Sequence, residues 1–293
     1  MLSIRPGFSI PVVLDYLKHA SNNARNVLNS SFDADKIGRY LTWAANEQRT
    51  LGAAISPKDM DRLVTTRTYW ALVSAGGVTA IALLDNELRE RIIGIEAQEA
   101  ALRQEHEHWA SVGWTTAVVL DTVVLMQNHA ALQITKWHEI VHERPMRTVR
   151  VMIPLIVIDE LDSLKRSSGN MMIAGKAVPQ RTLARQALRT IAKMFPTPRT
   201  VISVNQSENP SHALPVMFEL LPEPAEHVRL ANADSEIRDR ALALTAYTDR
   251  VVLATYDLGN KFASGLLNLE AIRLIEDEDK TLGQDLLSAP PRV

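Results

Sequence analysis

Residues 116–125 read TAVVLDTVVL, a β-branched apolar run interrupted by one aspartate, Asp121. The composition of 116–121 predicts a buried strand that ends at this aspartate. Burying a lone carboxylate costs several kcal/mol unless another group compensates for its charge. The stretch therefore predicts a strand and, at its end, an acid whose partner has to be found elsewhere in the chain.

The sequence that follows residue 114 alternates short β-branched runs with helical stretches. Four more runs predict strands, at 149–159 (VRVMIPLIVID), 200–204 (TVISV), 215–220 (PVMFEL) and 250–255 (RVVLAT). The helical stretches between the runs are 130–143, 179–195 and 235–248. Strands and helices that alternate at this spacing predict an α/β domain with a mainly parallel sheet.

The first 110 residues have a helical period throughout. Apolar residues recur three or four positions apart over 10–28, 34–55 and 56–75, and the charged segment 85–109 is expected to be one long, partly exposed helix. Asp33 and Ser56 occupy positions typical of helix N-caps. We expect an all-α N-terminal domain over 1–110, in which the long helix is either a rigid connector or a dimerisation helix.

Composition restricts the partners and the compartment. The 293 residues are 46% apolar and 23% charged, carry a net charge of -2 and include no cysteine. These proportions are typical of a folded soluble protein. The lack of cysteine excludes thiolate metal sites and is compatible with a reducing cytosol. The total charge gives no attraction to polyanions. The longest apolar run, 69–85, is shorter than the ~20 residues of a membrane-spanning helix and favours a helix pair broken at Gly76–Gly77. We expect a cytoplasmic protein with no signal peptide and no membrane segment.

Acidic residues follow the predicted strands. Asp121 ends the first strand, Asp159 and Glu160 follow the second, and Asp257 lies two residues beyond the last. Asp234 lies at the start of a helix, where it could be an ordinary N-cap, as could Asp159. Because ligands bind at the carboxyl ends of parallel strands, we expect these acids to share one edge of the sheet. A hard divalent cation such as Mg²⁺ or Mn²⁺ would offset their mutual repulsion.

The order and context of four of these acids resemble the PIN-domain nucleases. The matching segments are LDTVVL, IPLIVIDELDSLK, NADSEIRDRALAL and VVLATYDLGNKFAS, which contain Asp121, Glu160, Asp234 and Asp257. The resemblance covers about residues 115–275. It implies a PIN-like α/β/α domain with a parallel sheet, and a metal-dependent endonuclease that usually acts on RNA.

The resemblance also implies roles for individual residues. The catalytic residues and ligands of one or two Mg²⁺ or Mn²⁺ ions would be Asp121, Glu160, Asp234 and Asp257. Thr255 matches a family hydroxyl that steadies the acids. Two positions depart from the family, because Val123 replaces a common Asn or Ser and Tyr256 replaces a small polar residue. These departures support a second hypothesis, a catalytically weak or inactive PIN-like module that binds RNA or protein.

A rival motif, HEIVH at 138–142, matches the short zinc-protease pattern. On a helix, His138 and His142 would share one face and bind Zn²⁺, with Glu139 as the base. Pro145 ends such a helix almost at once, and no third ligand follows at a familiar spacing. A zinc metalloprotease is therefore the third hypothesis.

Basic residues recur every four positions within 179–195. They are Arg181, Arg185, Arg189 and Lys193, while Leu183, Leu188 and Ile191 are expected to face the core. This cationic face is either simply solvated or a surface for phosphate contacts. The preceding segment 165–179 begins with Lys165 and Arg166, and we expect it to be a long loop that is mobile or contacts a nucleic-acid strand.

The remaining expectations concern the end of the chain and its partners. Residues 276–293 begin with EDED and are expected to form an acidic, disordered tail. RNA is the expected substrate. A homodimer formed through the N-terminal helices and an inhibitor or partner protein are further candidates that the sequence leaves open.

Overall fold

The computed structural model of the protein describes residues 2–5, 7–30, 33–74, 79–110, 113, 115–173, 175–206, 215–224 and 227–274. The chain divides into two compact units, Met1–Ser111 and Val112–Val293, which we call the helical unit and the sheet unit. The predicted helix break at Gly76–Gly77 and the predicted tail at 276–293 lie outside the described residues. Among the described helices, none combines the length and apolarity that a bilayer crossing requires.

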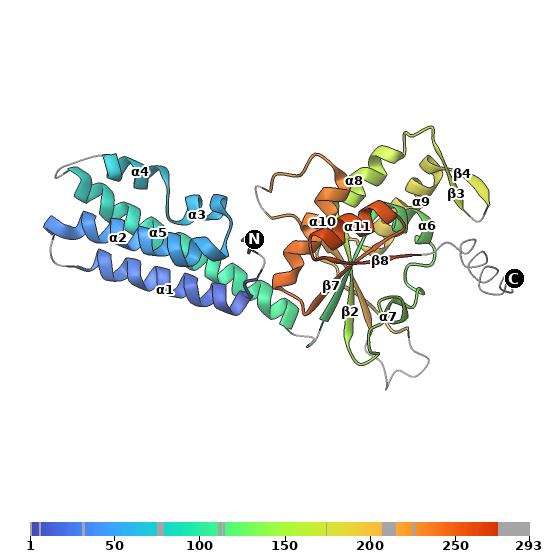
Figure 1. Ribbon diagram of the computed structural model, residues 1–293, viewed down its shortest axis with the longest axis horizontal. Coiled ribbons are helices and arrows are strands. Elements are labelled where there is room, and N and C mark those ends of the chain that lie inside the picture. The colour runs from blue at the N-terminus through green and yellow to red at the C-terminus, as the bar shows by residue number, and fades with distance from the viewer. Residues whose placement is uncertain are drawn as a thin grey trace, which may run out of the picture. The chain divides into compact units, whose positions relative to one another are not determined.

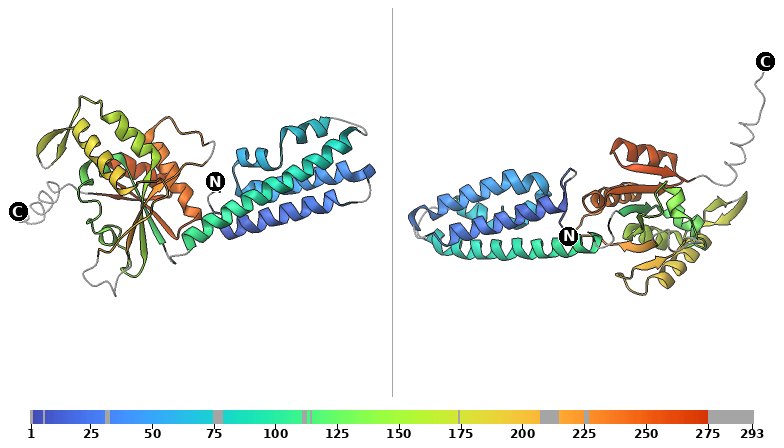
Figure 2. Two further views of the ribbon diagram at one scale, coloured as in Figure 1. Left: turned by 180° about the vertical axis from the view of Figure 1, so that it is seen from behind. Right: turned by 90° about the horizontal axis from the view of Figure 1, so that it is seen from below.

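The described part of the helical unit is almost entirely α-helical. Its elements are α1 (Ile10–Leu28), α2 (Asp33–Ala54), α3 (Pro57–Leu63), α4 (Arg67–Ser74) and α5 (Thr79–Ala110). Helices α1, α2 and α5 lie side by side, and α3 and α4 pack on α5 (Figures 1 and 2). Buried apolar residues recur along the inner faces of α1 and α5, as the helical period predicts.

The segment 56–74, which has a helical period in the sequence, forms two helices rather than one. Ser56 is the N-cap of α3, and its hydroxyl accepts a hydrogen bond from the amide of Asp59 at 3.1 Å. The chain leaves the helix at Val64, and the hydroxyl of Thr66 accepts from the amide of Tyr69 at 3.2 Å to start α4. A second cap inside an apolar run ends one helix and starts another, because it satisfies orphan amides.

The sheet unit is built on a six-stranded, mainly parallel sheet. Its strands are β1 (Thr115–Leu120), β2 (Thr148–Pro154), β5 (Ile202–Val204), β6 (Val216–Leu221), β7 (Arg250–Thr255) and β8 (Glu270–Arg273). The strand order is β5-β6-β2-β1-β7-β8, and all neighbours are parallel except β5 and β6. The two central strands, β1 and β2, are buried along their whole length. Continuous β-branched runs are the sequence signature of such two-sided burial.

Helices flank this sheet (Figure 1). They are α6 (Thr122–Asn128), α7 (Trp137–Ile140), α8 (Leu155–Leu164), α9 (Gln180–Met194), α10 (Ala233–Ala243), which a 3₁₀ turn at Leu244–Ala246 follows, and α11 (Leu258–Leu266). Helices α6, α8 and α9 pack on one another, α10 packs on α8 and β7, and α11 packs on β7 and β8. A parallel-dominated sheet flanked by helices, preceded by an all-helical region, is the predicted fold class.

Three boundaries differ from the sequence prediction. The strand predicted over 149–159 ends at Pro154, which is the N-cap of α8, so Asp159 and Glu160 lie within that helix rather than at its start. The expected loop at 165–179 contains an antiparallel hairpin of β3 (Asn170–Ile173) and β4 (Lys176–Pro179). Strand β8 was not predicted. An apolar run such as 153–158 suits a buried strand or a buried helix, and periodicity alone does not separate the two.

The connections define one switch point in the sheet. From β1 the chain moves outward through β2 to the edge strand β5, steps back to β6, and then crosses the sheet to β7 and β8. The direction reverses between β1 and β7, where Leu120 lies opposite Ala254. Ligands of open α/β sheets bind outside the carboxyl ends of the strands at such a point.

Candidate functional site

Asp121 occupies the switch point between β1 and β7. It follows β1 directly and is the N-cap of α6, with its Oδ1 accepting a hydrogen bond from the amide of Val124 at 2.8 Å. Its own amide donates to the carbonyl of Ala254 on β7 at 3.3 Å. Only 3% of its surface is exposed. The fold therefore fixes this buried carboxylate in one orientation.

The environment of Asp121 disfavours its negative charge. Burial raises the pKa of Asp121 to about 6, although hydrogen bonds from the hydroxyl of Thr255 and the amide of Val124 oppose the rise. The carboxylates of Asp234 and Glu160 raise that pKa further by repulsion. Asp234 and Glu160 are therefore the acids whose charges act on Asp121.

Separate contacts position Glu160 and Asp234. The hydroxyl of Thr122, the first residue of α6, donates to Oε2 of Glu160, which holds the half-buried Glu160 of α8 over the start of α6. Asp234 is the second residue of α10, whose N-cap is Asn232 rather than Asp234. Because Asn232 supplies the cap, accepting from the amide of Ser235 at 3.0 Å, the carboxylate of Asp234 is not needed to start the helix.

Asp257 joins the group less directly. It is the N-cap of α11 and its Oδ1 accepts from the amides of Gly259 at 2.6 Å and Asn260 at 3.3 Å. Its amide donates to the hydroxyl oxygen of Thr255 at 3.0 Å, and the buried Thr255 hydroxyl in turn donates to Asp121. The described contacts therefore link Asp257 to Asp121 through Thr255, and the exposed carboxylate of Asp257 remains open to solvent on its outer side.

No basic side chain in the described part of the chain forms an ion pair with any of these four acids. The cations on neighbouring elements have other partners, as Lys165 pairs with Asp162 and Arg229 pairs with Asp159 at 2.5 Å. The protein thus leaves the repulsion within the acidic group uncompensated. Oxygen donors alone fit a hard cation such as Mg²⁺ or Mn²⁺ and do not fit a thiolate- or imidazole-seeking metal.

The four acids do not form a closed ligand cluster among the described residues. Within the described residues, the three side chains whose ligand atoms all lie within 4.8 Å of one another are His227, Glu236 and Asp239, and no trio of the four acids meets that spacing. Arg240 already compensates the former group, at 3.4 Å from Glu236 and 2.5 Å from Asp239. Mg²⁺ is commonly held by one or two carboxylates and several waters, so the wider spacing of the four acids is compatible with it.

Comparison with known protein families connects this site to one of them. A family model described as PIN domain matches residues 118–274. The chain belongs to the PIN-domain family. Among solved structures, a domain of a functionally unknown protein from Methanocaldococcus jannaschii DSM 2661 is 15% identical, with a TM-score of 0.33, over 60% of this chain and 95% of that one. A search of curated proteins gave no match.

Family membership gives the sheet unit a nuclease-type fold and confirms the resemblance found in the sequence. The PIN domain also contains two residues, Arg238 and Asn260, that support the acids and that the sequence did not single out. Arg238 donates to Oδ1 of Asn260 at 2.6 Å and to the hydroxyl of Ser235 at 3.0 Å. These bonds tie α10, which carries Asp234, to the first turn of α11, which follows Asp257. The sequence feature that could have identified Arg238 is its position one helical turn after Asp234.

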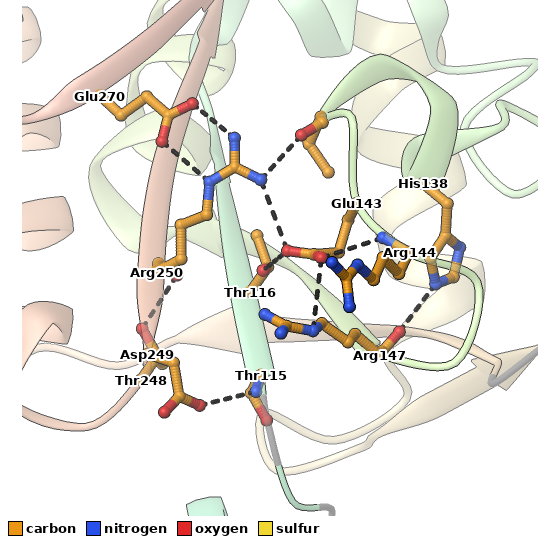
Figure 3. A network of polar contacts seen from close by, with 11 residues as sticks. Thr115, Thr116, His138, Glu143, Arg144, Arg147, Thr248, Asp249, Arg250 and Glu270 are labelled. Atoms are coloured by element: carbon orange, nitrogen blue, oxygen red, sulfur yellow. Dashed lines mark hydrogen bonds and ion pairs between the residues drawn. The ribbon is translucent and has the colours of Figure 1, made fainter.

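The HEIVH segment lies at the opposite end of the PIN sheet. Helix α7 ends at Ile140, and His142 has a φ of 51°, so His138 and His142 do not share a helical face. The His138 ring contacts the carbonyl of Arg147, and Glu143 accepts from the hydroxyl of Thr116 at 2.6 Å, near the amino end of β1 (Figure 3). The zinc-protease hypothesis was therefore wrong in its structural premise, because the segment is a turn that buttresses the strands.

The predicted cationic face is present on α9 of the PIN domain. Arg181, Arg185, Arg189 and Lys193 are exposed, while Leu183 and Ile191 are buried on the opposite face. None of the four has an ion-pair partner among the described residues. Lys165 pairs with Asp162, whereas Arg166 is exposed ahead of the β3–β4 hairpin. We call the four exposed residues on α9 the α9 ridge.

The structure shows the environment of the two residues that depart from the family motif, Val123 and Tyr256. Val123 is half-buried in the first turn of α6 and adds no polar group beside Asp121. The hydroxyl of Tyr256 accepts from Nδ2 of Asn128 at 3.0 Å. Tyr256 thus supports the end of α6, which is a structural reason for a large residue at that position.

Proposed function

We propose that this PIN domain is an Mg²⁺- or Mn²⁺-dependent endoribonuclease, with Asp121, Glu160, Asp234 and Asp257 as its metal ligands. The observation that supports the proposal most is the buried Asp121, whose charge is opposed by two neighbouring acids and by no basic side chain in the described residues. A bound divalent cation would supply that compensation, polarise a phosphate oxygen and lower the pKa of an attacking water.

The chain's own residues would pre-organise this chemistry. Asp121 is fixed by the amide of Val124 and the hydroxyl of Thr255, and Glu160 is fixed by the hydroxyl of Thr122. Ligands that are held before the substrate arrives need little reorganisation in the transition state, which is where electrostatic catalysis gains most. Catalysis at the switch point also leaves the outer surface of the acids free for a polynucleotide chain.

We further propose that the α9 ridge contacts the phosphates of the RNA. A repeat of one cation per helical turn matches a polyanion rather than a single carboxylate, and no described acid neutralises the ridge. Helix α9 packs on α6 and α8, which follow or carry Asp121 and Glu160. Arg166 and Lys165 would extend the contact toward the hairpin, with Lys165 leaving Asp162 to do so.

Replacing two arginines of the ridge is expected to weaken RNA binding without changing the fold. Arg185→Gln together with Arg189→Gln should lower affinity uniformly across sequences and reduce the slope of log K against log salt by about 1.4, because two phosphate contacts are lost and each contributes about 0.7 on a single strand. Fluorescence anisotropy with a labelled single strand over a salt series, in EDTA to prevent cleavage, measures both quantities. The control is Arg144→Gln, an exposed arginine near the HEIVH turn; an equal loss there would mean that the ridge has no special part in binding.

Thr255→Val is expected to weaken divalent-ion binding by about tenfold, which is the lower end of the effect of groups that support metal ligands. The substitution keeps the volume and the β-strand preference of this buried residue, but it removes the hydrogen bond that favours the charged form of Asp121. Titration calorimetry with Mn²⁺ measures the affinity. Thr116→Val, a buried hydroxyl at the amino end of β1, should leave it unchanged; unchanged affinity in both variants would remove Thr255 from the site.

The decisive experiment on the proposed function is a cleavage assay with the full chain. Single-stranded RNA, structured RNA and DNA are each incubated with Mg²⁺, Mn²⁺ or EDTA. We expect internal cleavage of RNA that EDTA abolishes and Mn²⁺ restores. RNA that binds but stays intact with every metal would instead support the binding-module hypothesis, which Val123 favours because it removes a polar group beside Asp121.

A further inference from the structure

Helix α11 exposes three large apolar residues and buries two polar ones. Leu258 is 46% exposed, Phe262 65% and Leu266 88%, while Asn260 and Ser264 are buried against the sheet. The hydroxyl of Ser264 donates to the carbonyl of Asn260 at 2.8 Å and Arg238 donates to Oδ1 of Asn260, whereas Nδ2 of Asn260 has no hydrogen-bond partner among the described residues. We call Leu258, Phe262 and Leu266 the α11 stripe. A row of large apolar side chains one turn apart is unusual on a solvated surface and marks a binding face.

The stripe is symmetric about Phe262. The helix reads LGNKFASGL, so leucines lie four residues on either side of Phe262 and glycines lie three residues on either side. At 3.6 residues per turn, the leucines and glycines share the face of Phe262, and Asn260 and Ser264 lie on the opposite face. A Cβ built on Gly265 would meet nothing within 4 Å, so no neighbour in the chain requires a glycine there. Two glycines in a nine-residue helix each cost about 1 kcal/mol relative to alanine.

We infer that the α11 stripe is the contact surface of a homodimer in which two copies of α11 pack antiparallel across a two-fold axis at Phe262. Isologous contacts require the same patch on both subunits and pair residue i with j and j with i. Under this axis each Leu258 meets Leu266 of the other copy, and the two Phe262 rings meet each other. Rows of residues four apart are the ridges that interlock in the commonest class of helix packing, and the flanking glycines leave grooves for them.

The small area of the α11 stripe determines the expected affinity of the dimer. A nine-residue helix is about 14 Å long, so one helix pair buries less than the ~800 Å² per partner of a standard stable interface. We therefore expect a dimer that forms at micromolar concentration and dissociates on dilution. This inference is independent of the nuclease proposal, because it uses none of the four acids.

Crosslinking tests the geometry directly, since the natural chain has no cysteine. Phe262→Cys places one thiol on the proposed axis, so mild oxidation of the full chain should give a disulfide-linked dimer within minutes. Ile134→Cys is the matched control, because Ile134 is a large apolar residue of the same unit that is 76% exposed. It should remain a monomer on a non-reducing gel under the same conditions.

Charge substitution tests the contribution of the stripe. The wild type is examined by analytical ultracentrifugation over a concentration series, and Phe262→Glu or Leu266→Glu should weaken self-association at least tenfold while Ile134→Glu does not. Both stripe residues are exposed, so circular dichroism and the melting temperature should stay as in the wild type. A wild type that is monomeric at every concentration overturns the inference. A dimer that resists both substitutions overturns it as well and points to another surface, such as the long helix α5.

Discussion

Asp121→Asn is expected to lower metal-dependent RNA cleavage by on the order of a thousandfold, because one charged ligand is lost from a pre-organised site. The amide side chain is nearly isosteric, and its oxygen can still accept the hydrogen bond from the amide of Val124 that starts α6. The loss should therefore appear in kcat/KM without a change of fold. Initial rates with a fluorescent single-stranded RNA at saturating Mn²⁺ measure it, with circular dichroism on the same sample.

The control for this experiment is Glu139→Gln. Glu139 is an exposed acid of the HEIVH turn, so the substitution is chemically alike but lies at the other end of the sheet. It should cleave at the wild-type rate. Asp257→Asn should lose activity as Asp121→Asn does, and full activity in both aspartate variants would show that the four acids are not the catalytic site. Equal loss in Glu139→Gln would instead point to contamination by another nuclease.

The same substitution is expected to stabilise the metal-free protein at alkaline pH. The pKa of Asp121 rises from its ordinary value of 3.8 to about 6 in the folded protein. Its ionisation therefore opposes folding: the cost is absent well below pH 3.8, grows between these two pKa values, and reaches about 3 kcal/mol above the higher one. Asp121→Asn removes this charge, so the variant should exceed the wild type in stability by as much as about 3 kcal/mol at pH 8 and match it near pH 4.

Divalent ions should cancel most of this difference in stability. A ligand at one hundred times its dissociation constant stabilises the folded state by about 2.7 kcal/mol, and this gain is expected for the wild type and not for Asp121→Asn. Thermal unfolding at several pH values, with EDTA or with Mn²⁺, gives all four conditions. If the stability of the wild type changes with neither pH nor Mn²⁺ in this range, Asp121 is not a buried metal ligand whose charge is disfavoured in the metal-free protein.

The central sheet was predictable because its strands are short, continuous and β-branched, as in TAVVL before Asp121. The end of β2 was not, since the run from Ile153 to Ile158 is apolar at every position and Pro154 alone marks the change to helix. Strand β8 was missed because four residues with half-exposed side chains give no pattern. Helix α11 was not predicted, and its large apolar residues Leu258, Phe262 and Leu266 face outward rather than into the core.

The four acids could be located from their order along the chain, and their contacts could not. The pairing of Thr255 with Asp121 depends on the register of β7 on β1, which sets two residues that are distant in sequence side by side. The link from Arg238 to Asn260 likewise depends on how α10 and α11 pack. Such contacts follow from tertiary packing, and local patterns carry no information on them.

The register of β7 on β1 also determines when the proposed nuclease becomes active in the life of the polypeptide. These neighbouring strands are 134 residues apart where the amide of Thr115 meets Asp249, and β7 must insert beside β1 before Thr255 and Asp257 can reach Asp121. Because chains emerge from the ribosome with the N-terminus first, a nascent chain that ends before β7 holds an incomplete acidic group. Under the proposed function, RNA cleavage would therefore begin only after β7 has paired with β1.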